Sequence, residues 1–142
     1  MSRQLSLILA LSFPWLGTGV GAEDVPLTLE KMREYGTMLL VHAESARVLD
    51  ELIERHHTPE MMKKYGARLH PMTRPNFIEA EAIQRAVQWS EATGGQLYIV
   101  HMSTGEGADI IRAAQARGVP VIAETCVQYL VLDDSVFGRE DG

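Results

Sequence analysis

The chain has 142 residues, 46% of them apolar and 23% charged, so it is long enough to form one ordinary globular domain. Its net charge of −6 is scattered, and without a run of Lys and Arg the chain lacks the pattern of a nucleic-acid-binding protein. The single cysteine, Cys126, excludes an internal disulfide and a zinc site built on paired cysteines, so histidine and carboxylate side chains must bind any metal.

Residues 1–22 differ in character from the rest of the chain. An apolar run from Leu5 to Leu11, followed by small residues before Glu23, is typical of a secretory signal. The run is too short for a membrane span, which needs about twenty apolar residues. A buried strand and helix start, or foreign sequence joined to a truncated gene, are the alternatives. The sequence therefore predicts a signal-like or non-family leader (1–22) and one domain (23–142).

Beyond this leader, helical and strand-like segments alternate, which predicts βα units around a mainly parallel sheet. Expected helices cover residues 27–35, 45–56, 59–66, 76–93 and 106–117, and expected strands cover 37–42, 96–101 and 119–124. The continuous apolar run of the first strand is typical of a sheet with helices on both faces. Residues 67–75 contain two prolines and predict a loop. The tail after Cys126 is less regular.

The longest expected helix begins with the spacing of a capping box, because Glu79 lies three residues after Asn76. Glu81 is assigned to the solvated face. The inner face of this helix consists of apolar and small residues at helical spacing: Ile78, Ala82, Ile83, Ala86, Val87 and Ser90.

Two expected strands end in a histidine, at His42 and at His101. The carboxyl ends of parallel strands form the functional face of α/β folds, so the two imidazoles are expected to converge there. Neutral imidazole is a good zinc ligand, and Glu124 at the end of the third strand is placed to orient a ring. A strand-end histidine is also common as a plain hydrogen-bonding residue, and two ligands are fewer than the three of a catalytic zinc site.

Other candidates have simpler explanations. His56 and His57 end a helix, where a cation favours the helix dipole, and His70 lies in the proline-containing segment. Cys126 is expected to be a small buried residue, and Arg74 a surface arginine with the alternative of binding an anion. The turn-prone Ser103–Gly107 segment resembles a phosphate-binding loop only loosely.

Four motifs together resemble the hydantoinase and dihydropyrimidinase branch of the amidohydrolase superfamily. They are Val41-His-Ala-Glu44, Arg74-Pro-Asn-Phe-Ile-Glu-Ala-Glu-Ala-Ile83, Leu97-Tyr-Ile-Val-His-Met-Ser103 and Ala123-Glu-Thr-Cys-Val-Gln-Tyr-Leu130, and the resemblance runs from about Glu23 to the C-terminus.

The resemblance implies an α/β fold of the (β/α)8 TIM-barrel type, of which this chain would form about three βα units, strands five to seven. It implies a two-metal centre, usually zinc, that activates water for attack on a cyclic amide. His42 and His101 match the family's histidine ligands on these strands. Glu44, Ser103 and Glu124 lie in the same motifs without an assigned role, so catalytic and substrate-binding residues stay unknown.

The family's remaining ligands, a His-x-His pair, a carboxylated lysine and an aspartate, have no match in this sequence. The metal site is therefore expected to be incomplete and the chain inactive alone. The resemblance further implies a small cyclic amide or ureide substrate, a homo-oligomer and a cytoplasmic location, with a secreted or periplasmic one if the leader is a signal. A dihydroorotase- or allantoinase-like enzyme, a non-catalytic dihydropyrimidinase-like scaffold and a secreted α/β binding domain are the alternatives.

Overall fold

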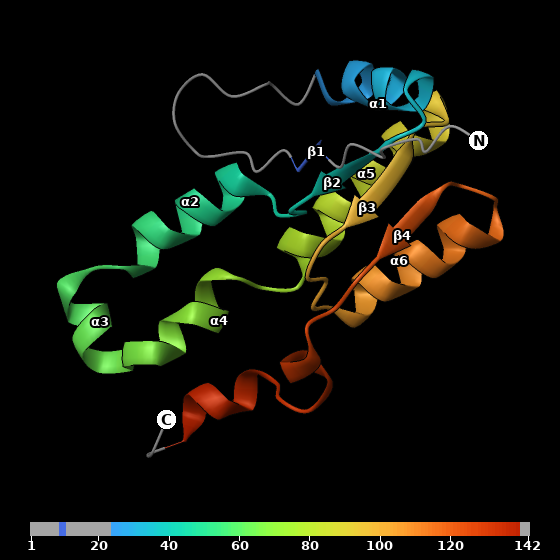
Figure 1. Cartoon of the computed structure of the whole chain (residues 1–142). Helices are drawn as coiled ribbons and strands as arrows, with labels where there is room; N and C mark the ends of the chain where they lie inside the picture. The colour runs from blue at the N-terminus through green and yellow to red at the C-terminus, as the bar shows by residue number, and fades with distance from the viewer. Residues whose placement is uncertain (1–8, 11–23, 140–142) are drawn as a thin grey trace.

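The computed structural model describes residues 9–10 and 24–139 (Figure 1). Its strands are β1 (Leu9–Ala10), β2 (Met38–Val41), β3 (Gln96–Ile99) and β4 (Val121–Ala123). Its helices are α1 (Asp24–Glu34), α2 (Ala46–His56), α3 (Pro59–Tyr65), α4 (Leu69–Thr73), α5 (Phe77–Thr93) and α6 (Gly105–Ala116), with 3-10 turns η1 (Gly66–Arg68), η2 (Val127–Leu130) and η3 (Asp134–Gly138). The chain is thus an α/β protein, as its sequence predicts.

The four strands form one parallel sheet in the order β1-β2-β3-β4. The three strands expected after the leader are all present, and α5 and α6 connect them in succession (Figure 1). The two-residue β1 pairs with β2 and falls within the expected leader. The rest of the leader lies outside the described residues, so its assignment as a signal stays a prediction.

Helices of the described chain cover one face of the sheet, which corrects the expectation of helices on both faces. Leu39, Leu97 and Val121 are paired in register and buried against α1, α5 and α6. One position further along each strand, Leu40 and Tyr98 are only partly buried and Ile122 is 50% exposed. Both faces of β2 are therefore apolar, which explains its continuous apolar run, but these helices cover only one of them.

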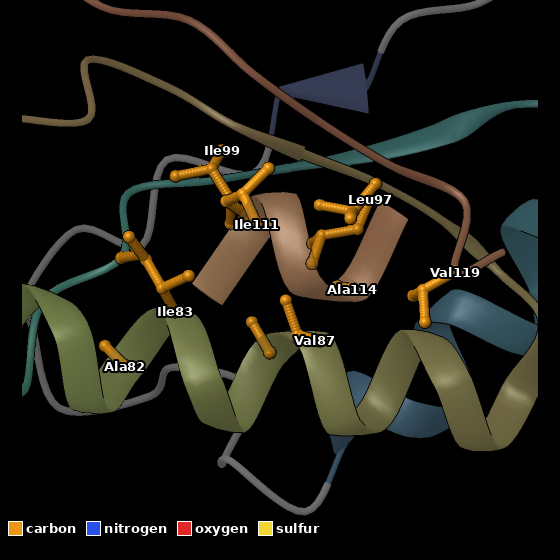
Figure 2. Close-up of a cluster of buried hydrophobic side chains, with 11 residues drawn as sticks. Ala82, Ile83, Val87, Leu97, Ile99, Ile111, Ala114 and Val119 are labelled. Atoms are coloured by element: carbon orange, nitrogen blue, oxygen red, sulfur yellow. The ribbon is translucent and has the colours of Figure 1, made fainter. Parts of the chain in front are cut away.

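The core lies between the sheet and the pair α5 and α6 (Figure 2). All six residues expected on the inner face of the long helix are buried. Ile83 and Val87 point toward Leu97, Ile99 and the α6 side chains in Figure 2. Burial of such side chains contributes about 1.5–3 kcal/mol each, and it fixes α5 against the sheet.

Residues 67–73 are helical where a loop was expected, and only residues 74 and 75 of that segment are irregular. Gly66–Arg68 forms η1 and Leu69–Thr73 forms α4. Pro71 lies in the first turn of α4, where its missing N–H removes no helical hydrogen bond. Leu69 and Thr73 are buried and anchor the segment, and the Thr73 hydroxyl donates to the Leu69 carbonyl within α4 at 3.0 Å. Together with α2 and α3 it extends away from the sheet (Figure 1).

Candidate metal-binding site

His42 and His101 meet at the carboxyl edge of the sheet. Their rings lie 4.7 Å apart between centroids, and His42 Nδ1 and His101 Nε2 are 2.5 Å apart, so one ring donates an N–H to the other. His42 follows β2 directly, and His101 lies two residues after β3. The two histidines that the sequence singled out therefore converge as predicted.

Two main-chain hydrogen bonds hold the segment that carries His101. The Val100 N–H donates to the Val41 carbonyl at 3.2 Å, and the Met102 N–H donates to the Glu124 carbonyl at 2.8 Å. Between them His101 has a φ of 42°, which costs a residue with a Cβ about 1–3 kcal/mol and persists only where its surroundings hold it. This bend interrupts the alternation of side chains along β3, a feature that a sequence pattern does not reveal.

Glu124 does not orient a ring in the way expected. Its carboxylate accepts a hydrogen bond from the Tyr98 hydroxyl at 2.7 Å, and this bond raises the pKa of Tyr98. Its backbone, by contrast, bonds to both sides of the His101 segment, since the Glu124 N–H donates to the Ile99 carbonyl at 3.0 Å. Glu124 thus supports the site through its main chain.

The expected capping box at Asn76 is wrong. Asn76 has helical dihedral angles and makes no cap, and its amide instead donates to the Glu106 carboxylate at 3.1 and 3.2 Å. Glu79 accepts hydrogen bonds from Ser103 and Thr104, at the start of α6. Its carboxylate occupies the Ser103 and Thr104 amides, which are therefore not free to bind a phosphate group.

The other histidines lie elsewhere. His56 bonds to the Leu52 carbonyl of its own helix at 2.8 Å. His57, His70 and Arg74 line an open cavity of about 260 Å³ beside α3 and α4. Burial, with Arg74 adding to it, lowers the pKa of His70, whose ring stacks on Phe137. The structure does not bring His57, His70 or Arg74 to the pair formed by His42 and His101.

Tyr129 is a titratable residue that the sequence reasoning did not single out. Burial is the main cause that raises the pKa of Tyr129. Its interaction with Cys126 and the charges of Glu79 and Glu44 raise this pKa further. Cys126 itself is half-buried, in line with a packing role. Tyr129 lies in the short 3-10 turn η2, where no periodic pattern marks it.

The donor set fits part of a metal centre. Two imidazole nitrogens, a donor type that zinc and similar ions accept, lie together at this edge of the sheet. Within residues 9–10 and 24–139, no group of three His, Cys, Asp or Glu side chains is placed to hold an ion. A catalytic zinc has three protein ligands, so the described residues supply a pair of donors and not a complete site.

The fold and these residues define a class: a parallel α/β protein with a histidine pair at the carboxyl edge of its sheet. No protein-family model matches the chain. The D-hydantoinase of Geobacillus stearothermophilus is 41% identical over 112 residues, which are 76% of this chain and 22% of that protein.

Solved structures agree with this similarity. The D-hydantoinase from Bacillus sp. AR9 superposes with a TM-score of 0.78 at 33% identity, over 95% of this chain and 28% of that one. The dihydropyrimidinase from Brevibacillus agri NCHU1002 gives 0.77 at 31% identity, over 95% and 28%. The chain is therefore a homologue of the hydantoinases, as its motifs predicted, and it spans about a quarter of their length.

No helix in the described part of the chain is both long and apolar enough to cross a membrane.

Proposed function

We propose that this chain is part of a metal-dependent hydrolase of cyclic amides, of the hydantoinase or dihydropyrimidinase type, and that His42 and His101 are two of its metal ligands. The observation that carries the proposal is the contact between the two rings at the carboxyl edge of the parallel sheet. Similarity to D-hydantoinases over most of the chain supports it.

The histidine pair would serve this chemistry through its ring nitrogens. Both facing nitrogens must present lone pairs to bind an ion, so the N–H that one ring now donates to the other must be carried on the opposite ring nitrogen. The hydrogen bonds at Val100 and Met102 hold the His101 segment while this proton moves. A bound divalent metal would polarise the amide carbonyl and lower the pKa of water.

The site would be incomplete in this chain alone. The described residues bring two donors together, whereas a catalytic zinc needs three. We therefore expect no hydrolysis from the isolated chain, and we propose that residues 23–142 correspond to strands five to seven of a (β/α)8 barrel. The zinc identity, a cyclic ureide substrate, a homo-oligomer and a cytoplasmic location follow from the resemblance only and form part of the same proposal.

The test is a zinc titration of the purified chain by calorimetry, together with assays of hydantoin and dihydrouracil hydrolysis. We expect His42→Ala and His101→Ala each to reduce zinc affinity by at least tenfold. His56→Ala is the matched control, because its ring bonds within its own helix. Zinc binding that survives both site variants would refute the ligand assignment.

Zinc binding separates the two functional candidates, because neither of them predicts hydrolysis by the isolated chain. Turnover that depends on both histidines would show that further ligands come from another chain. A folded chain that binds no zinc and hydrolyses neither compound would support a non-catalytic, dihydropyrimidinase-like scaffold, a candidate favoured by the presence of two donors only.

A further inference from the structure

Glu79 holds the segment that carries His101. Its Oε1 accepts hydrogen bonds from the Ser103 N–H at 2.8 Å and the Ser103 hydroxyl at 3.1 Å. Its Oε2 accepts from the Thr104 N–H at 2.8 Å and from the Thr104 hydroxyl. Four donors on one carboxylate make a strong, directional anchor, and both donor residues lie within three positions of His101.

The same helix holds the segment that carries His42. The Ser45 N–H donates to the Ile78 carbonyl at 3.1 Å, and the Ser45 hydroxyl donates to the Glu81 carboxylate. Ser45 is buried and lies three residues after His42. The first turns of α5 therefore bond to both histidine-bearing segments, through residues 78 and 81 on one side and residue 79 on the other.

The junction between Glu79 and α6 is closely packed. A Cβ at Gly107 would lie 2.8 Å from Ile83 Cδ1, 2.9 Å from Thr104 Oγ1 and 3.4 Å from Glu79 Oε2. The Gly107 N–H donates to the Thr104 hydroxyl at 3.1 Å. Glycine thus lets α6 approach α5 closely enough for the carboxylate to reach its donors, which argues that this contact is built into the fold.

We propose that Glu79 is a positioning residue that sets the distance between His42 and His101, with Glu81 in the matching role for the His42 segment. Neither carboxylate contacts a ring in the described structure; each acts through the loop that it holds. The purpose of this arrangement rests on the proposed metal site, whereas the positioning itself does not.

The experiment compares the wild-type chain with Glu79→Gln by NMR, measuring the nuclear Overhauser effect between the ring protons of His42 and His101. We expect the inter-ring signal to fall by more than half in Glu79→Gln, while the methyl signals of Ile83 and Val87 are unchanged. Glu91→Gln is the matched control: its carboxylate lies on the same helix and bonds to Arg117 at 3.1 Å. A full inter-ring signal in a folded Glu79→Gln chain would overturn the proposal.

A second variant decides the matter if Glu79→Gln does not fold. Thr104→Val keeps the N–H bond and removes the hydroxyl bond to Glu79, so it should weaken the inter-ring signal, and Thr104→Ser should restore it. Equal signals in all three chains would contradict the positioning role.

Titration with Co²⁺ alone separates this inference from the proposed function. If the wild type binds Co²⁺, Glu79→Gln should weaken binding by about tenfold, the usual effect of losing a group that orients a ligand. If the wild type binds none, the metal site is refuted, yet a loss of the inter-ring signal in Glu79→Gln would still establish the positioning.

Discussion

Gly95 lies directly against Leu29: a Cβ at position 95 would be 2.5 Å from the Leu29 carbonyl oxygen and 2.8 Å from the Leu29 Cβ. The contact joins the turn between α5 and β3 to the middle of α1. Both partners are buried, and Leu29 belongs to the small core between α1 and Leu39. The close approach of α1 to the sheet therefore depends on the absence of a side chain at position 95.

Gly95→Ala should lower the free energy of unfolding by more than about 2 kcal/mol, because backbone and Cβ atoms of Leu29 cannot move aside cheaply. Urea denaturation followed by circular dichroism measures the change. Gly105→Ala is the control, since a Cβ there meets nothing within 4 Å and alanine favours the helix. Equal midpoints for Gly95→Ala and wild type would contradict the prediction.

Leu97→Ala should destabilise the chain by about 2–5 kcal/mol, the usual effect of emptying a core leucine site. Leu97 is 1% exposed and pairs in register with Leu39 and Val121, so its loss affects the centre of the sheet. Leu130→Ala, at a position 72% exposed, should change stability by less than about 0.5 kcal/mol. Thermal unfolding of both variants provides the test. Similar losses of stability in Leu97→Ala and Leu130→Ala would show that Leu97 is not a core residue.

Much of this arrangement could be predicted from the helical repeat and from the topology of parallel sheets. The helical spacing from Ile78 to Ser90 identified the buried face of α5 because a helix on a sheet buries one stripe. The convergence of His42 and His101 was predicted by a topological rule: the carboxyl ends of neighbouring parallel strands meet at one edge. Both predictions depend on regular features of secondary structure: the repeat of a helix and the common direction of parallel strands.

The missed features depend on contacts between distant positions. Glu79 was assigned to a local capping box, but its donors lie 24 and 25 residues later, at the start of α6. The short helix α4 was not predicted because it contains Pro71. Proline usually marks a loop and is tolerated only in the first turn of a helix. The positive φ of His101 falls on a residue other than glycine, so composition gave no sign of it.

Ile122→Thr should reduce self-association of the chain while leaving its fold intact. Ile122 is 50% exposed on the sheet face that the described helices leave uncovered, beside Tyr98 and then Leu40 in register. Exposed apolar sheet surface favours association between copies. Sedimentation velocity over a range of concentrations measures the effect.

The control for this experiment is Leu27→Thr, because Leu27 is an exposed leucine on α1 and not on the sheet. If self-association falls equally in both variants, general surface hydrophobicity is responsible and the uncovered sheet face has no special part.

Protonation of His70 should destabilise the chain at acidic pH. Burial lowers the pKa of His70 from its usual value of 6.5, Arg74 lowers it further, and Glu44 opposes them. The unfolded chain therefore binds the proton more readily than the folded chain. Stability from this group is fully present above pH 6.5 and is lost as the pH falls through the lower, folded-state pKa.

His70→Phe should remove this component of the pH dependence, because phenylalanine cannot titrate and can still stack on Phe137, whose ring lies 5.2 Å from that of His70. Thermal unfolding of both chains from neutral to mildly acidic pH measures it, and the variant should gain stability relative to wild type as the pH falls. His56→Phe controls for the loss of a histidine as such. Parallel curves for His70→Phe and wild type would show that the His70 environment does not discriminate against its charged form, and the acid sensitivity of the chain would then have to arise at other groups.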